Sequence, residues 1–138
     1  MNRSDFQKLS DVRIQEAKLL LENSRYEGAY YLAGYAVEFA LKACIAKLTQ
    51  QYEFPPNRKE IDRLYSHDLS TLLEVAQLKT TLESEISSSH ELHDNWKVVK
   101  QWSEQSRYGL KSRHEAEDLF NAITDSHFGI LVWLIKYW

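Results

Sequence analysis

The residues best suited to chemistry lie in the segment RYGLKSRH, which runs from Arg107 to His114. An arginine is always charged and can stabilise negative charge that develops on a phosphate, while a histidine can exchange protons near neutral pH. The segment leads into a helix expected to begin near Arg113, and a helix N-terminus attracts anions. The segment therefore predicts an anion site, and the pair Arg107 and His114 could cleave a phosphodiester without a metal ion.

Charge is unevenly distributed around this segment. Residues 81–94 carry four acidic side chains and no lysine or arginine, whereas residues 95–114 carry five basic side chains against one acid, Glu104. Two interpretations stay open: the basic segment is a solvated charged face, or it is an anion-binding patch beside aromatic rings that could stack bases. The second interpretation predicts these ligand-binding residues: Arg107, Tyr108, Lys100, Lys111 and Arg113.

Other histidines give weaker signals. The string HELHD, residues 90–94, places two histidines and a carboxylate at helical spacing, but it matches no complete metal motif, so we predict a polar surface and no metal. His127 falls on an apolar stripe and is expected in the core, and His67 is expected to help start a helix. Since glycine-rich phosphate loops and nucleophile motifs are absent, we predict no cofactor.

Composition favours one globular domain over residues 1–138. The chain is 43% hydrophobic, has a net charge of −3 and contains one cysteine, Cys44, which lies in an apolar helix and is expected to be a core residue. The negative net charge excludes broad electrostatic coating of nucleic acid, so any such contact must be local. The N-terminus lacks an apolar run of signal-peptide type, so we expect a cytoplasmic protein with no membrane contact.

The elements that must position the basic segment are helices. Between residues 26 and 48, alanines recur in steps of four and three, with a second apolar stripe beside them, which predicts a helix covered on more than one side. Glu38 and Lys42, an i,i+4 acid–base pair, interrupt its apolar middle. The alanines of the first stripe are Ala29, Ala33, Ala36, Ala40 and Ala43.

Further helices are expected on both sides of this central one. The patterns predict a first helix to about Asn23, a short helix after Asp68 or Ser66, a helix over 80–103 that breaks near the serines at 87–89, and a last helix over 113–136. The second helix should end before Pro55, and 51–66 should be a polar connection with a turn of helix. The predicted class is all-α, an antiparallel up-and-down four-helix bundle with a short accessory helix.

Three motifs in this order resemble the HEPN family, the higher eukaryotes and prokaryotes nucleotide-binding domain. They are GAYYLAGYAVEFALKACIAK, SHDLSTLLEVA and WSEQSRYG, and the resemblance extends from about Phe6 to the C-terminus. It implies a helical bundle that binds nucleotides or RNA, is commonly a dimer and is often encoded with a minimal nucleotidyltransferase. Many family members that cleave RNA have an arginine separated from a histidine by four to six residues; six residues separate Arg107 from His114, at the edge of that pattern.

The resemblance leaves several functions open. Tyr108 stands where the ribonuclease members usually have a polar residue, so the Arg-Tyr pair is closer to members that work with nucleotidyltransferases. We therefore expect a nucleotide- or RNA-binding module in a toxin–antitoxin-like or regulatory pair. The alternatives are a metal-independent endoribonuclease that uses Arg107 and His114 at a dimer interface, and a structural protein-interaction bundle.

A homodimer is expected from the amount of apolar surface. The second helix and the tryptophan-bearing helices carry more apolar side chains than one four-helix core should cover. The predicted interface residues are Trp96, Trp102, Trp133 and Trp138.

Overall fold

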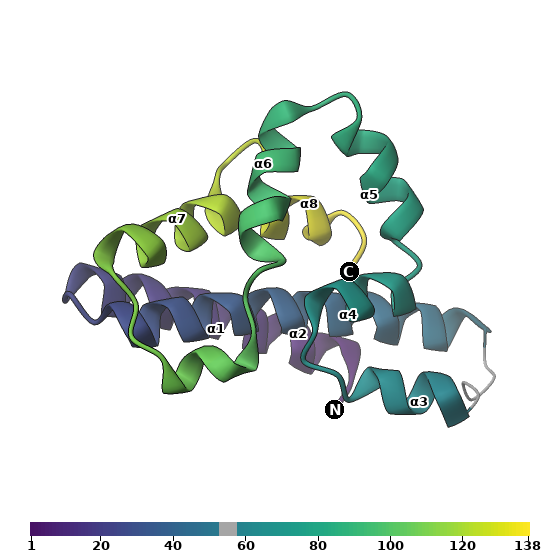
Figure 1. Cartoon of the computed structure of the whole chain (residues 1–138). Helices are drawn as coiled ribbons and strands as arrows, with labels where there is room; N and C mark the ends of the chain where they lie inside the picture. Colours follow the sequence, from purple (N-terminus) through teal and green to yellow (C-terminus); the bar gives the residue numbers. More distant parts are fainter. Residues whose placement is uncertain (53–57) are drawn as a thin grey trace.

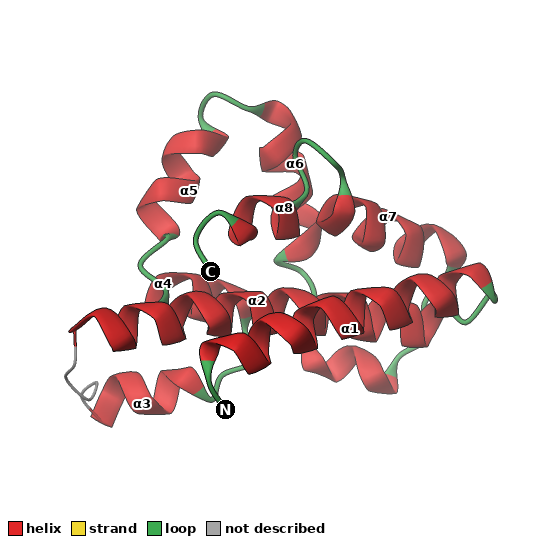
Figure 2. Cartoon of the chain, turned by 180° about the vertical axis from the view of Figure 1, so that it is seen from behind, coloured by secondary structure: helices red, strands yellow, loops and turns green. Residues whose placement is uncertain are grey.

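Helices make up every regular element in the computed structural model, which describes residues 1–52 and 58–138 (Figures 1 and 2). The predicted all-α class is confirmed, since no strand occurs in those two ranges. The elements are α1 Arg3–Glu22, α2 Tyr26–Tyr52, α3 Arg58–Leu64, α4 Leu69–Val75, α5 Lys79–Ile86, α6 His90–Val99, the 3₁₀ helix η1 Glu104–Tyr108, α7 Arg113–Thr124 and α8 Ile130–Ile135.

α1 and α2 form an antiparallel hairpin. They lie side by side along most of their length in Figures 1 and 2, and a tight turn joins them in which Ser24 has a positive φ of 60°. The close approach is possible because small residues line the contact, and the Ser10 hydroxyl donates a hydrogen bond of 2.7 Å to the carbonyl of Ala36. This bond satisfies a hydroxyl that packing would otherwise leave buried without a partner.

α2 is the central helix of the fold, as the alanine pattern predicted. All five alanines of the stripe are buried. The second apolar stripe is also buried at Tyr30, Val37, Leu41 and Cys44. The helix contacts α1, α4, α7, α8 and η1, which explains why it is apolar around most of its circumference. The prolines at 55 and 56, expected to follow the end of this helix, lie outside the described residues.

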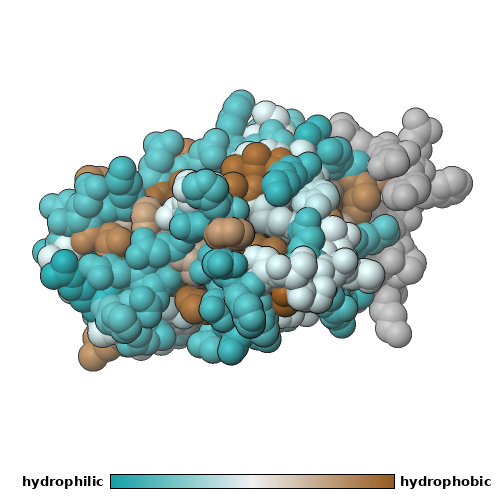
Figure 3. All heavy atoms as spheres, turned by 90° about the horizontal axis from the view of Figure 1, so that it is seen from above, coloured by the Kyte–Doolittle hydropathy of each residue, from teal (hydrophilic) through white to brown (hydrophobic). Residues whose placement is uncertain are grey.

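The middle of the chain forms short helices. Asp68 caps α4 by accepting a 2.9 Å hydrogen bond from the backbone N–H of Thr71, as one of the two predicted caps. The helix expected over 80–103 breaks at the serines as predicted, with α5 before them and α6 capped by Ser89 after them. Seen from above, the surface on this side is mostly hydrophilic, with hydrophobic atoms in separate small patches (Figure 3).

The last helix was predicted to be continuous, but the chain turns between α7 and α8. The Asp125 carboxylate accepts hydrogen bonds from the backbone N–H groups of His127 and Phe128, at 3.2 and 2.7 Å, and Gly129 then begins α8. His127 is consequently exposed, and the prediction of a core histidine was wrong. The prediction failed because the apolar residues keep their helical spacing on both sides of a turn that the Asp125 side chain stabilises.

Three of the four predicted tryptophans are not available as interface residues. Trp96, Trp102 and Trp133 are buried inside one chain, and the carbonyl of the half-buried Trp138 accepts a hydrogen bond from the Arg3 guanidinium. The predicted interface was therefore wrong for the first three, because α5 to α8 fold over α2 and enclose these rings.

Two further expectations concern Cys44 and the membrane. Cys44 is buried in the core, and burial raises the pKa of its thiol to about 12, so it is an inert packing residue at neutral pH. No helix in the described part of the chain has the length and apolar character needed to cross a lipid bilayer.

Candidate functional site

A chain of ionisable side chains joins three elements that are far apart in the sequence. Glu38 lies on α2, His67 immediately precedes the cap of α4, and Glu104 begins η1. The imidazole Nδ1 of His67 lies 2.8 Å from Glu38 Oε1, and its Nε2 lies 2.5 Å from Glu104 Oε2. We call these three residues the acid–histidine cluster. It brings together the three motifs on which the family resemblance depended.

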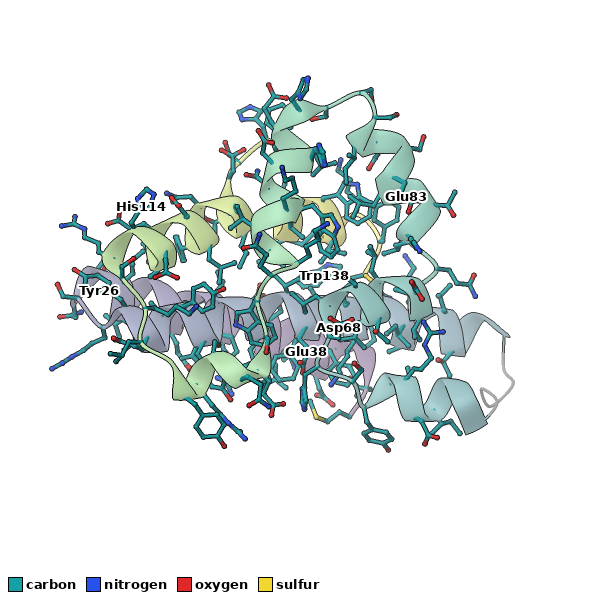
Figure 4. The ribbon with its side chains drawn as sticks, in the orientation of Figure 1. Tyr26, Glu38, Asp68, Glu83, His114 and Trp138 are labelled. Carbon is teal, nitrogen blue, oxygen red and sulfur yellow. The ribbon has the colours of Figure 1, made fainter. Side chains whose placement is uncertain are left out.

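Glu38 is the buried end of the acid–histidine cluster. Its side chain is 1% exposed, and both carboxylate oxygens have partners, since Oε2 lies 3.2 Å from the Nζ of Lys42. The i,i+4 pair expected from the sequence is therefore present. Figure 4 shows Glu38 beside Asp68, where α2 meets the start of α4. A buried charge requires such partners, so Glu38 fixes the position of His67 against α2.

His67 does more than start a helix. Asp68 provides the cap of α4, while both nitrogens of the His67 ring face carboxylate oxygens. The ring therefore bridges an acid on α2 and an acid on η1. The ring is partly exposed and lines a cavity of about 240 Å³ together with Trp102, Glu104 and neighbouring residues of η1.

Aromatic rings pack beside the acid–histidine cluster on α2. The ring of Tyr35 lies edge-on to Trp102, with centroids 5.2 Å apart, and its hydroxyl is 3.5 Å from Glu104 Oε2. Burial, followed by the hydrogen bond with Tyr31, raises the pKa of the Tyr35 hydroxyl. Tyr35 therefore stays neutral and can donate to Glu104.

Arg107 and Tyr108 form an exposed pair at the end of η1. The guanidinium carbon of Arg107 lies 4.7 Å from the centroid of the Tyr108 ring, and 74% of Tyr108 is exposed. A hydrogen bond with the Tyr31 side chain is the main cause that raises the pKa of Arg107. One guanidinium nitrogen lies 3.7 Å from Glu104 Oε1, so Arg107 is adjacent to the acid–histidine cluster.

The other predicted binding residues have partners of their own. Lys111 lies over the ring of Tyr30, with Nζ 4.4 Å from the centroid and 3.5 Å from a Glu115 oxygen. The guanidinium of Arg113 is 2.7 Å from Glu117, whereas Lys100 lines a separate groove formed by α4, α5 and α6. The predicted basic patch is therefore divided. Within the described residues, Arg107 and Tyr108 are the members of the patch that contact each other.

His114 lies apart from Arg107 within one chain. It occupies the first turn of α7, its side chain is 85% exposed, and its Nε2 lies 3.1 Å from Asp118. In Figures 1 and 2, α7 and η1 lie on opposite sides of α2, and Figure 4 shows His114 at the outer end of α7. Joint action of Arg107 and His114 would require a second chain.

The sequence interpretation predicted none of the three members of the acid–histidine cluster as site residues. Glu38 was the available signal, because an acid inside an otherwise apolar helix must find cationic or hydrogen-bonding partners. The identity of those partners depends on contacts 29 residues away, which spacing does not reveal. Among residues 1–52 and 58–138, no group of three histidine, cysteine or carboxylate side chains could hold a metal ion.

Comparison with known families gives one match. The family model described as HEPN domain matches residues 9–126, a range that contains the acid–histidine cluster, Arg107, Tyr108 and His114. No curated protein and no solved structure matches the chain.

Proposed function

Since the chain belongs to the HEPN family, a group of nucleotide- and RNA-related modules, we propose that it binds a nucleotide or a short RNA at Arg107 and Tyr108. The guanidinium would contact a phosphate in a bidentate manner, and the exposed face of the tyrosine ring would stack against a base. The chain would work with a minimal nucleotidyltransferase in a toxin–antitoxin-like or regulatory pair.

The observation that carries this proposal is the pairing of Arg107 with Tyr108. A cation and an aromatic ring that lie together on the surface offer both contacts that a nucleotide needs. Adjacent Glu104 is engaged by His67 at 2.5 Å, whereas its other oxygen is 3.7 Å from Arg107. The guanidinium can therefore accept a second anion.

We expect Arg107→Ala to weaken binding of ATP or a short oligouridylate by about tenfold, because it removes a charge-assisted phosphate contact. Arg113→Ala is the matched control. It removes the same charge on the first turn of α7, where Glu117 already engages the guanidinium, and we expect a change of about twofold at most. Fluorescence anisotropy of a labelled oligouridylate at constant ionic strength measures both. Equal losses would indicate a diffuse basic patch and contradict the proposal.

We also expect a homodimer, detected by light scattering as a mass of two chains at micromolar concentration. The ribonuclease alternative depends on this result, because Arg107 and His114 lie apart in one chain and would have to meet across a two-fold axis. RNA cleavage that continues in excess chelator and is lost in His114→Ala would support that alternative. A mass of one chain would contradict both the dimer and the shared nuclease site.

A further inference from the structure

We infer that His67 is a positioning residue for the Arg107 site: it holds Glu104 away from Arg107 and so keeps the guanidinium available for a phosphate. This inference depends on the proposed binding function, and it adds the element that regulates the charge of the site. The residues concerned come from α2, the start of α4 and η1, which no local pattern connects.

Glu104 lies between the His67 ring and the Arg107 guanidinium and is hydrogen-bonded only to the ring. Its Oε2 is 2.5 Å from the Nε2 of His67, a direct hydrogen bond, whereas its Oε1 is 3.7 Å from the Arg107 guanidinium, beyond hydrogen-bonding distance. The Tyr35 hydroxyl, 3.5 Å from Oε2, lies on the same side as His67. The carboxylate is therefore bound more closely on the α2 side, and it forms only a longer ion pair with Arg107.

The position of His67 is itself fixed from the protein interior. Its Nδ1 is 2.8 Å from Glu38, whose side chain is buried on the central helix and is also paired with Lys42. Glu38 cannot follow the ring outward without losing its partners in a poorly solvated place. The order of contacts thus runs from the core through Glu38 and His67 to Glu104 at the surface.

Loss of the His67 contact should release Glu104 toward Arg107. The two residues are three positions apart in η1, and side chains at i and i+3 of a 3₁₀ helix project on the same side. A freed carboxylate would form a closer ion pair with the guanidinium and compete with a phosphate for it. The site would then be neutralised from within the chain.

Two isosteric substitutions separate the two contacts of the ring. His67→Asn places an amide nitrogen near the position of Nδ1, which preserves the Glu38 contact and removes the Glu104 contact. His67→Gln places it near Nε2 and preserves the Glu104 contact. We expect His67→Asn to weaken oligouridylate binding about fivefold and His67→Gln to change it by less than about twofold. Thermal melts of both variants identify any loss of folded protein.

A second-site substitution tests the cause. Glu104→Gln removes the competing charge, so the double variant His67→Asn, Glu104→Gln should bind at least as tightly as the wild type, whereas damage to the fold would not be repaired. Equal losses in the two His67 variants, or no recovery in the double variant, would overturn the inference. These results are distinct from failure of the proposed function, in which Arg107→Ala in the wild-type background would leave oligouridylate binding unchanged.

Discussion

Gly34→Ala is expected to lower the free energy of unfolding by about 2 kcal/mol or more, although alanine favours helices by about 1 kcal/mol over glycine. Gly34 lies in α2 directly under the indole of Trp102, and a methyl group there would lie 2.0 Å from the nearest ring carbon. Trp102 is 2% exposed and packs against Tyr31 and Tyr35, so the ring must lose these contacts to make room for the methyl group. Urea denaturation measures the change.

Gly28→Ala in the same helix is the matched control. The added methyl group would lie 3.1 Å from the end of the Leu20 side chain, which is flexible and only partly buried. We expect a change of less than about 0.5 kcal/mol, since helix propensity offsets the small displacement. A Gly34→Ala protein as stable as Gly28→Ala would show that Trp102 does not require this close approach.

The central hairpin could be predicted from the sequence because its physics is local. The spacing of alanines places small residues on one face of α2, and all of them are buried against neighbouring helices. The break between α5 and α6 was predictable for a similar reason, because Ser87 and Ser88 donate to nearby carbonyls and Ser89 caps the next helix.

The turn between α7 and α8 was missed although one residue marks it. A side chain at Gly129 would lie 2.5 Å from the carbonyl oxygens of Ile123 and Asp125, so the turn accepts only glycine. Apolar spacing on both sides continued through it and favoured one long helix. The carboxylate of Asp125 and the glycine together were the stronger signal.

The site was predicted in part. Arg107 and Tyr108 are adjacent in the sequence, and the structure shows them as an exposed cation–aromatic pair. The acid–histidine cluster depends on three elements that meet only in the folded chain, so neither its membership nor the engagement of Glu104 could be predicted. The same limit explains why the tryptophans were wrongly assigned to a dimer interface, because hydrophobic composition does not distinguish a core from an interface.

Glu38→Ala is expected to lower the free energy of unfolding by about 2 kcal/mol. Because the His67 contact with Glu104 is kept, we expect oligouridylate binding at Arg107 to change by less than about twofold, as in His67→Gln. Removal of the carboxylate leaves the side chains of Lys42 and His67 without their buried partner, and the cost would be larger if both side chains were completely buried. Their side chains are 18% and 44% exposed, so water can solvate them after the carboxylate is removed. We therefore expect the smaller loss of about 2 kcal/mol.

Glu38→Gln preserves the volume of the side chain and tests whether its charge matters. An amide can accept one hydrogen bond, but its NH₂ group would face either His67 or Lys42, which are both donors, so we expect a stability between those of the wild type and Glu38→Ala. Urea denaturation and oligouridylate anisotropy on the same samples compare stability with binding. If Glu38→Ala unfolds at the wild-type urea concentration, the cost of burying the carboxylate equals the stabilisation from its two partners, and the acid–histidine cluster is not held in place from the core.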